Sequence, residues 1–506
     1  MDCGAGVESN PAPFRSLEMP MEGQITIVGL GPDGPAGLTR EASEAIEAAD
    51  RVFLRTSEHP AASRLAASRP CESFDPAYAA GASFEEVYRR IVDRILETAR
   101  SGASVVYAVP GDPVVGEATT TALRAAAVSA GVPFRILHAA SFIEPCLELA
   151  GVDALDGLQV LDGAEIARRH FPPLTPDQPA LLGQVYSRLV ASDLKLVLLA
   201  QYPPQHPLLV IDAAGTAQAR TETVPLEELD RQERFSAATA VFVPPLAQAS
   251  SFESFQETIA HLRAPDGCPW DRQQTHASLR PHLLEETYEA LEAIDGDDPT
   301  ALREELGDLL LQIVLQAQIA SEAADFSMAD VIAGIQRKLV RRHPHVFGDV
   351  VVAGVDEVLH NWEHLKADER AKAGEGRGAL DGVPRSLPAL AQALEIQERA
   401  ARLGFDWRSV EGVRAKMREE WDELEAATDE RQRGDEVGDL LFAVVNYARW
   451  LGVDPEAALR QTNRRFRDRF AFMERSAGAG GASLGEMNLE ELEGLWREAK
   501  RHERQG

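Results

Sequence analysis

The sequence is poor in the residues that would build a disulfide scaffold, a nucleic-acid surface or a membrane span. Among 506 residues there are 51 lysines and arginines against 81 acids, a net charge of -30, which argues against a nucleic-acid polymer as partner. No apolar run reaches ~18 residues, so no membrane span is expected. The few cysteines form no CxxC pair, which argues against structural zinc or a disulfide framework and fits a reducing cytoplasm: Cys3, Cys71, Cys146 and Cys268.

The first part of the chain alternates short β-rich runs with helical patterns. Residues 1–22 lack the basic start and apolar core of a signal peptide, and we expect a disordered tail there. The alternation that follows predicts an α/β domain with a substantially parallel sheet over residues 23–246. The predicted strands include ITIVGLG (25–31), RVFLR (51–55), SVVYAVPGDP (104–113) and, later, PFRILHA, LKLVLLAQY and VFVPP.

The second half has almost no alternating pattern and many helical periods. Two all-α units are predicted, at 252–372 and 380–506. The Gly- and Pro-rich stretch 371–388 between them predicts a linker.

This helical half contains an internal repeat. LLEETYEALEAI (283–294) matches MREEWDELEAAT (417–428), and EELGDLLLQIVLQAQIA (304–320) matches DEVGDLLFAVVNYARWL (435–451). Glu286 aligns with Glu420 at an offset of 134, and Glu305 aligns with Glu436 at an offset of 131. Because the pattern occurs twice, the prediction of a helix pair is better supported than it would be from either copy alone.

Each copy carries four acids with helical spacing. E-E-x-x-E on one helix is followed by E-x-x-D on the next, and positions i and i+3 share a helix face. Two antiparallel helices would bring these carboxylates together, where Mg²⁺ would neutralise them and bridge to phosphates. The alternative is a solvated face, or acids that favour the helix dipole. Because apolar runs follow both Asp308 and Asp439, we expect both helices to enter a core directly after the acid.

The segments around these acids resemble the MazG family of nucleoside triphosphate pyrophosphohydrolases in its two-domain form. Besides the acidic repeats, the matching segments are CPWDRQQTHASLRPHLLEE (268–286), KLVRRHPHVFGDV (338–350), NWEHLKADE (361–369), LDGVPRSLPALAQALEIQERAARLGFDW (380–407) and NRRFRDRF (463–470). The resemblance implies an all-α bundle, a homodimer, and Mg²⁺-dependent (alternatively Mn²⁺-dependent) hydrolysis of nucleoside triphosphates to the monophosphate and pyrophosphate.

The resemblance also assigns roles within the second repeat, which looks catalytic. Four acids would hold the metal: Glu420, Glu423, Glu436 and Asp439. Lys416 and Glu419 would contact the phosphates and the attacking water, whose proton Glu419 could take. Asn463 and Arg467 would reach the triphosphate, and Trp496 and Lys500 resemble groups near the nucleoside.

The first repeat is open to two readings. It keeps all four acids of a second metal site, namely Glu286, Glu289, Glu305 and Asp308. It lacks a close counterpart of NRRFR, having RRHPHVF (341–347) in a similar place, so we expect a mainly structural role. Trp270 in CPWD is expected to pack in the core.

The α/β domain begins with GLGPDG (29–34), which formally matches G-x-G-x-x-G. An NAD site is rejected, because Pro32 and Pro35 disrupt the helix start and Asp50 precedes its strand rather than ending it. Residues 24–245 resemble instead the tetrapyrrole methylase family, which uses S-adenosylmethionine, through IVGLGPDGPAGLT, VVYAVPGDPVVGEATT (105–120) and SFIEPCLELAGVDALDGLQVLD (141–162). The resemblance implies a cofactor cleft lined by Gly29, Gly31, Pro32, Gly111 and Asp112.

Fusion of such a domain to MazG repeats is a known arrangement, that of the YabN-type proteins. The leading hypothesis is a cytoplasmic Mg²⁺-dependent nucleoside triphosphate pyrophosphohydrolase. The alternative is an S-adenosylmethionine-dependent methyltransferase whose helical half is a regulatory or nucleotide-sensing module. A non-catalytic nucleotide-sensing scaffold is a third hypothesis. No residue identifies a methyl acceptor.

Overall fold

The computed structural model describes residues 23–33, 37–80, 83–355, 357–358, 361–362, 378, 380–479 and 482–503. The predicted tail 1–22 and residues 371–377 and 379 of the predicted linker lie outside these residues. The chain divides into two units, Met1–Thr258 and Ile259–Gly506. The predicted boundaries between the two helical repeats stay predictions.

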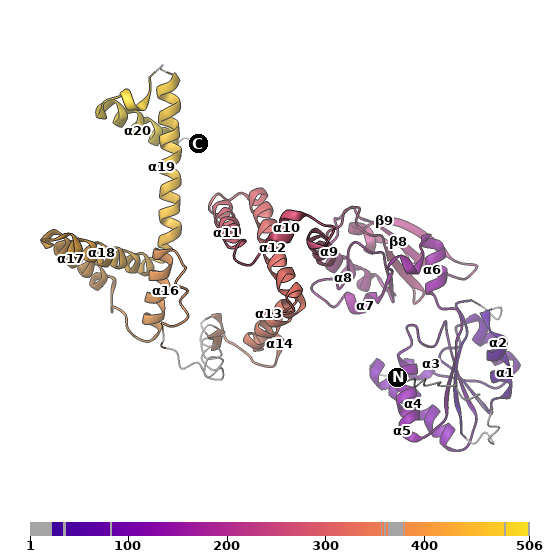
Figure 1. Ribbon diagram of the computed structural model, residues 1–506. Coiled ribbons are helices and arrows are strands. Elements are labelled where there is room, and N and C mark those ends of the chain that lie inside the picture. Colours follow the sequence, from indigo (N-terminus) through magenta and orange to yellow (C-terminus); the bar gives the residue numbers. More distant parts are fainter. Residues whose placement is uncertain are drawn as a thin grey trace, which may run out of the picture. The chain divides into compact units, whose positions relative to one another are not determined.

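The first lobe of unit 1 is a parallel sheet with the strand order β3-β2-β4-β1-β5. Helices α1 and α2 cover one side of this sheet, and α4 and α5 cover the other (Figure 1). The strands are β1 (Ile25–Gly29), β2 (Arg51–Leu54), β3 (Glu72–Ser73), β4 (Val105–Val109) and β5 (Phe134–Leu137). The helices are α1 (Arg40–Ala48), α2 (Pro60–Ser68), α3 (Asp75–Ala80), α4 (Phe84–Arg100) and α5 (Ala118–Ala130).

Burial on both faces explains why this sheet is parallel and apolar. Every residue of β1 and β4 is buried, as expected of strands covered by helices on both sides. Helix α4 begins where the Ser83 side chain accepts a hydrogen bond from the Glu86 N–H, and its buried face includes Val87, Ile91 and Ile95, four residues apart.

The second lobe holds a mixed sheet with the strand order β6-β7-β10-β8-β9, in which only the pair β6–β7 is parallel. Its strands are β6 (Gln159–Asp162), β7 (Ala180–Gly183), β8 (Pro207–Asp212), β9 (Arg220–Pro225) and β10 (Thr239–Val243), with helices α6 (Ile143–Ala150), α7 (Gly163–Ile166) and α8 (Arg188–Leu198). The predicted strand LKLVLLAQY is wrong, since α8 occupies most of it. Ser187 caps this helix, and Ala191, Leu194 and Leu198 are buried with helical spacing.

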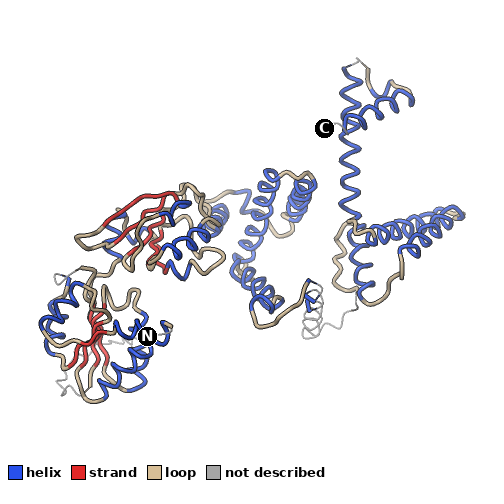
Figure 2. Tube along the Cα trace, turned by 180° about the vertical axis from the view of Figure 1, so that it is seen from behind, coloured by secondary structure: helices blue, strands red, loops and turns tan. Residues whose placement is uncertain are grey.

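Unit 2 is helical, and the strands are confined to unit 1 in the part of the chain that Figure 2 colours. Its helices are α9 (Phe252–Arg263, which crosses the unit boundary), α10 (Pro269–Gln273), α11 (Arg280–Asp295), α12 (Pro299–Glu322), α13 (Met328–Arg342), α14 (Pro344–Phe347), α16 (Ala389–Arg402), α17 (Val410–Ala426), α18 (Glu430–Trp450), α19 (Pro455–Ala479) and α20 (Leu489–Glu503). No helix among the described residues is long and apolar enough to span a membrane.

The helix pairs α11–α12 and α17–α18 correspond to the two sequence repeats, but their apolar runs are less buried than expected. In α18, Ala443 and Val445 are buried, whereas Leu441 is 52% exposed and Phe442 is 43% exposed. The expectation that each helix enters a core directly after its acid is therefore wrong within one chain. Among the described residues, α16, α17 and α19 pack against α18, and part of its apolar surface stays exposed.

Candidate active site

The second repeat gathers three of its predicted metal-binding carboxylates. Glu420 and Glu423 on α17 and Glu436 on α18 each offer an oxygen, and these oxygens lie within 4.8 Å of one another. Glu420 is only 5% exposed. A set of carboxylate oxygens at this spacing fits a hard cation such as Mg²⁺, which prefers oxygen ligands.

The charges around this group fit a site made for a cation. Partial burial raises the pKa of the Glu436 carboxyl, and the neighbouring carboxylates of Glu423 and Glu420 raise it further. Lys416 supplies the local counter-charge, because its Nζ lies 2.7 Å from Glu419 Oε1 and 2.7 Å from Glu420 Oε1. These two hydrogen bonds raise the pKa of Lys416 well above its usual value.

A cavity of about 760 Å³ opens beside the carboxylates. Asp439 stands outside the group of three oxygens, yet it lines this cavity together with Lys416 and Glu420. The size is that of a cleft for a small ligand. The four predicted ligands thus lie at one place, three as a tight group and Asp439 on the adjoining wall.

The other walls of this cavity include residues that the sequence prediction missed. Phe405, Trp407 and Phe442 give it aromatic sides, and Gln397 and Asn446 add amides. No local sequence pattern marks Trp407 as a cavity residue; in the structure it packs against Gly412, where an added Cβ would lie 2.7 Å from the indole ring. That close approach holds the tryptophan loop against the start of α17.

The predicted triphosphate and nucleoside groups lie elsewhere within the chain. Asn463 and Arg467 are exposed on α19, and neither lines the 760 Å³ cavity. Trp496 on α20 packs against Phe466 of α19 with ring centroids 5.1 Å apart, and Lys500 Nζ lies 5.8 Å from the centroid of the Trp496 ring. A single chain therefore does not bring these four groups to the carboxylates.

The first repeat builds the same kind of carboxylate group. Oxygens of Glu286, Glu289 and Glu305 also lie within 4.8 Å of one another. Partial burial raises the pKa of Glu286, and the charges of Asp308 and Glu289 raise it further. Where the second repeat has Lys416, this repeat has His282, whose Nδ1 lies 3.7 Å from Glu285 Oε2.

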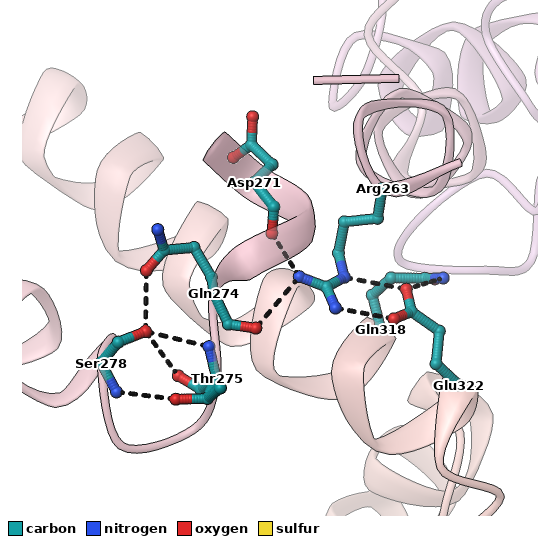
Figure 3. Close-up of polar contacts among 7 residues, drawn as sticks. All are labelled: Arg263, Asp271, Gln274, Thr275, Ser278, Gln318 and Glu322. Atoms are coloured by element: carbon teal, nitrogen blue, oxygen red, sulfur yellow. Dashed lines mark hydrogen bonds and ion pairs between the residues drawn. The ribbon is translucent and has the colours of Figure 1, made fainter. Parts of the chain in front are cut away.

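Elsewhere in the first repeat an arginine links helices α9, α10 and α12 (Figure 3). Arg263 at the end of α9 is 6% exposed, and its Nη2 lies 2.7 Å from Glu322 Oε2 on α12. It also donates to the backbone oxygens of Asp271 and Gln274, which follow the CPW segment. Trp270 is 57% exposed, so its predicted place in the core is wrong.

Unit 1 contains a second cleft, of about 540 Å³, lined by segments of both lobes. Gly31 and Gly111 face each other there as an isolated bridge, and both have positive φ, 71° and 63°. Gln184 and Ala213, at the same cleft, also have positive φ, a costly conformation that clusters at functional sites. Four of the predicted residues line this cleft, namely Gly31, Pro32, Gly111 and Asp112. Gly29, the fifth, does not line it.

Polar groups in this cleft are largely engaged with one another. Asp112 Oδ2 accepts from Ala139 N–H at 3.1 Å and lies 2.9 Å from His138 Nδ1. His59 Nε2 donates to Gly31 O at 3.0 Å, and burial lowers the pKa of this histidine. Asp112 therefore shapes the loop, while the glycine backbone leaves space for a ligand.

Comparison with known proteins agrees with both halves of this architecture. A family model described as tetrapyrrole (corrin/porphyrin) methylases matches residues 24–230, and one described as MazG nucleotide pyrophosphohydrolase domain matches residues 274–347. A Bacillus subtilis protein named "Uncharacterized protein YabN" is 39% identical over 498 residues, covering 96% of this chain and 100% of that protein. The chain belongs to the YabN-type family, a MazG protein with a methylase-like domain.

Two MazG relatives cover the helical half. The "Nucleoside triphosphate pyrophosphohydrolase/pyrophosphatase MazG" of Thermotoga maritima is 46% identical, over 49% of this chain and 95% of its own length. The "Nucleoside triphosphate pyrophosphohydrolase" of Escherichia coli (strain K12) is 47% identical, over 48% of this chain and 95% of its own length. The MazG family model itself falls on the first repeat, so membership alone does not choose between the repeats.

Proposed function

We propose that this YabN-type chain hydrolyses nucleoside triphosphates to the monophosphate and pyrophosphate, with Mg²⁺ held by the second repeat. The observation that carries the proposal is the cavity of about 760 Å³ that opens onto Glu420, Asp439 and Lys416. Carboxylates without room for a substrate would bind only a cation, whereas these border a cleft with a basic group at its edge.

The residues divide the work as follows. Glu420, Glu423, Glu436 and Asp439 would hold the cation, which would supply positive charge to neutralise the triphosphate. Lys416 offsets the negative charge that grows on the departing pyrophosphate. The 2.7 Å contact of Lys416 with Glu419 keeps that carboxylate beside the cation ligands, where it accepts the proton of the attacking water.

The nucleoside occupies the aromatic end of the same cavity. Trp407, Phe405 and Phe442 offer flat surfaces on which a base stacks, and stacking tolerates different bases. This proposal moves the nucleoside away from Trp496 and Lys500, whose rings and charges are engaged between α19 and α20. Mn²⁺ would substitute for Mg²⁺, because both accept carboxylate oxygens.

The protein acts as a homodimer in this proposal. Large apolar side chains on α18 are exposed in one chain, including Val437 (43%), Leu441 (52%) and Val444 (41%). A second copy packing on this face would bury them, and its α19 could bring Asn463 and Arg467 to the triphosphate. A cytoplasmic location fits the substrate class and the free thiols of Cys71, Cys146 and Cys268.

The test is the identity of the products. Full-length protein is incubated with each NTP and Mg²⁺, and products are separated by anion exchange and ³¹P NMR. The proposal expects the monophosphate and pyrophosphate in equal amounts, and none when EDTA removes the cation. Release of the diphosphate and orthophosphate, or binding without turnover, would contradict it.

A second candidate function belongs to unit 1. The cleft with Gly31, Gly111 and two strained non-glycine residues favours binding of S-adenosylmethionine, because backbone without side chains lets a ligand approach closely. Calorimetry on the full-length protein should detect binding of S-adenosylmethionine that Gly111→Val, which adds bulk at a positive φ, abolishes. No heat of binding with wild-type protein would remove this candidate.

A further inference from the structure

The middle of helix α19 buries no residue, and its packing partner there is α20, the next helix of the chain, through Phe466 and Trp496. Among its 25 residues the buried ones are Pro455, Met473 and Ala477, which lie towards its two ends. Asn463 and Arg467 lie between them, on the stretch without a buried residue. A helix is normally held in rotation by a buried stripe. Because α20 packs on α19 itself, it does not fix how α19 is turned relative to the first repeat, and a contact with the first repeat would do so.

That contact is with the last residue of α11 in the first repeat. Arg460 Nε lies 3.2 Å from Asp295 Oδ2, with side chains 26% and 15% exposed. Arg464 Nη2 donates to the backbone oxygen of Asp295 at 2.6 Å. The carbonyl oxygens at a helix C-terminus lack partners in the helix and carry partial negative charge, which suits the guanidinium of Arg464, while Arg460 pairs with the Asp295 carboxylate.

Helix geometry links this contact to the predicted phosphate groups. At 3.6 residues per turn, Arg467 lies about 20° around the helix axis from Arg460, and Asn463 about 60°. The contact that holds Arg460 and Arg464 against Asp295 therefore also fixes the direction of Arg467 and Asn463. Rotation or fraying of this stretch would displace both.

We propose that Asp295 is a positioning residue for nucleotide hydrolysis: in each chain the first repeat holds α19 in the rotation that directs its Asn463 and Arg467 to the triphosphate bound by the other copy of the dimer. This inference rests on the proposed function and gives the first repeat a part in it. Asp295 touches neither substrate nor cation. It acts through Arg460 and Arg464.

Kinetics of the full-length protein test the inference. Asp295→Ala should raise KM for the NTP about fivefold while kcat stays within about twofold, because the triphosphate contacts serve substrate and transition state alike. Arg460→Ala/Arg464→Ala should raise KM further.

Glu292→Ala, an exposed acid on the last turns of α11, is the matched control and should behave like wild type. The charge swap Asp295→Arg/Arg460→Asp should recover most of the lost KM. An unchanged KM in Asp295→Ala, or no recovery in the swap, would overturn the proposal.

Hydrogen–deuterium exchange separates this inference from the proposed function. Asp295→Ala should speed amide exchange in the peptide covering 455–470 and leave the peptides of α17 and α18 unchanged. Unchanged exchange in 455–470 would show that the contact does not hold α19, whatever the activity. Faster exchange in a protein that produces no monophosphate would instead refute the proposed function alone.

Discussion

The two repeats of the helical half hold the same carboxylates but differ in what lies beside them. Each brings carboxylate oxygens of three glutamates to within 4.8 Å of one another. In the second repeat Lys416 contacts Glu419 and Glu420 at 2.7 Å, while in the first the aligned His282 lies 3.7 Å from Glu285. A duplicated cation site therefore need not mean a duplicated active site.

The space next to the carboxylates differs in the same way. The second repeat leaves a cavity with Asn446 and Arg449 on its α18 wall, and the aligned positions of α12 are Leu315 and Gln318. Gln318 Nε2 donates to Glu322, the acid that holds the buried Arg263. In the first repeat this part of α12 contributes to a structural ion pair, whereas in the second repeat the aligned part of α18 lines the cavity.

The largest difference between the repeats should appear when the same predicted metal ligand is substituted in each of them. Glu423→Gln should lower the rate of monophosphate release by about 100-fold or more, since it removes a cation ligand. Glu289→Gln, at the aligned position, should leave the rate within about twofold. A steady-state pyrophosphate assay on both variants checks this, and equal losses would mean that both repeats turn over.

The second-largest difference between the repeats should follow from removing the basic side chain at the edge of the cavity. Lys416→Ala should lower kcat about 100-fold, because it removes a charge that faces the leaving pyrophosphate. His282→Ala should have no measurable effect on kcat. Circular dichroism of both variants serves as the control for folding, and full activity in Lys416→Ala would exclude its role at the phosphates.

The helix pairs and their acids could be predicted from sequence, because i, i+3 spacing repeated twice is a local pattern. Asp308 and Asp439 stand outside the groups of three, since the exact reach of a side chain depends on neighbouring helices. The Arg263 network and the exposure of Leu441 were not predictable, because both depend on which distant segments pack there. Helix α8 was missed because LKLVLLAQY taken alone resembles an apolar strand, and the helical spacing of Ala191, Leu194 and Leu198 appears only when the preceding residues are included.

A smaller difference should arise at the aromatic end of the cavity. Trp407→Ala should raise KM about tenfold, as expected for a lost stacking surface. Trp270→Ala, in the CPWD segment of the first repeat, should leave KM unchanged. Initial rates across a range of NTP concentrations compare the two, and a raised KM for both would place the substrate in both repeats.

The smallest expected effect is one that both repeats share. Burial and like charges raise the pKa of Glu436, Glu286 and Glu305 above their ordinary 4.5. Without a cation the folded protein therefore binds more protons than the unfolded chain. Its free energy of unfolding then falls as the pH rises through the raised pKa values of these carboxyls. Mg²⁺ binds the ionised form, and its stabilisation should therefore grow with pH. We expect a rise in Tm of about 5 °C at pH 8 and almost none at pH 4.5. Calorimetric scans with Mg²⁺ or EDTA measure it, and an equal rise at both pH values would contradict carboxylate ligation.

The most direct test of the central claim compares two triple variants of the full-length protein. One is Glu286→Gln/Glu289→Gln/Glu305→Gln, and the other is Glu420→Gln/Glu423→Gln/Glu436→Gln. Monophosphate release is measured for each with saturating NTP and Mg²⁺. The second repeat is the hydrolytic centre if the first variant keeps at least half of the wild-type rate and the second keeps no measurable rate. Activity that survives in the second variant and disappears in the first would contradict that claim.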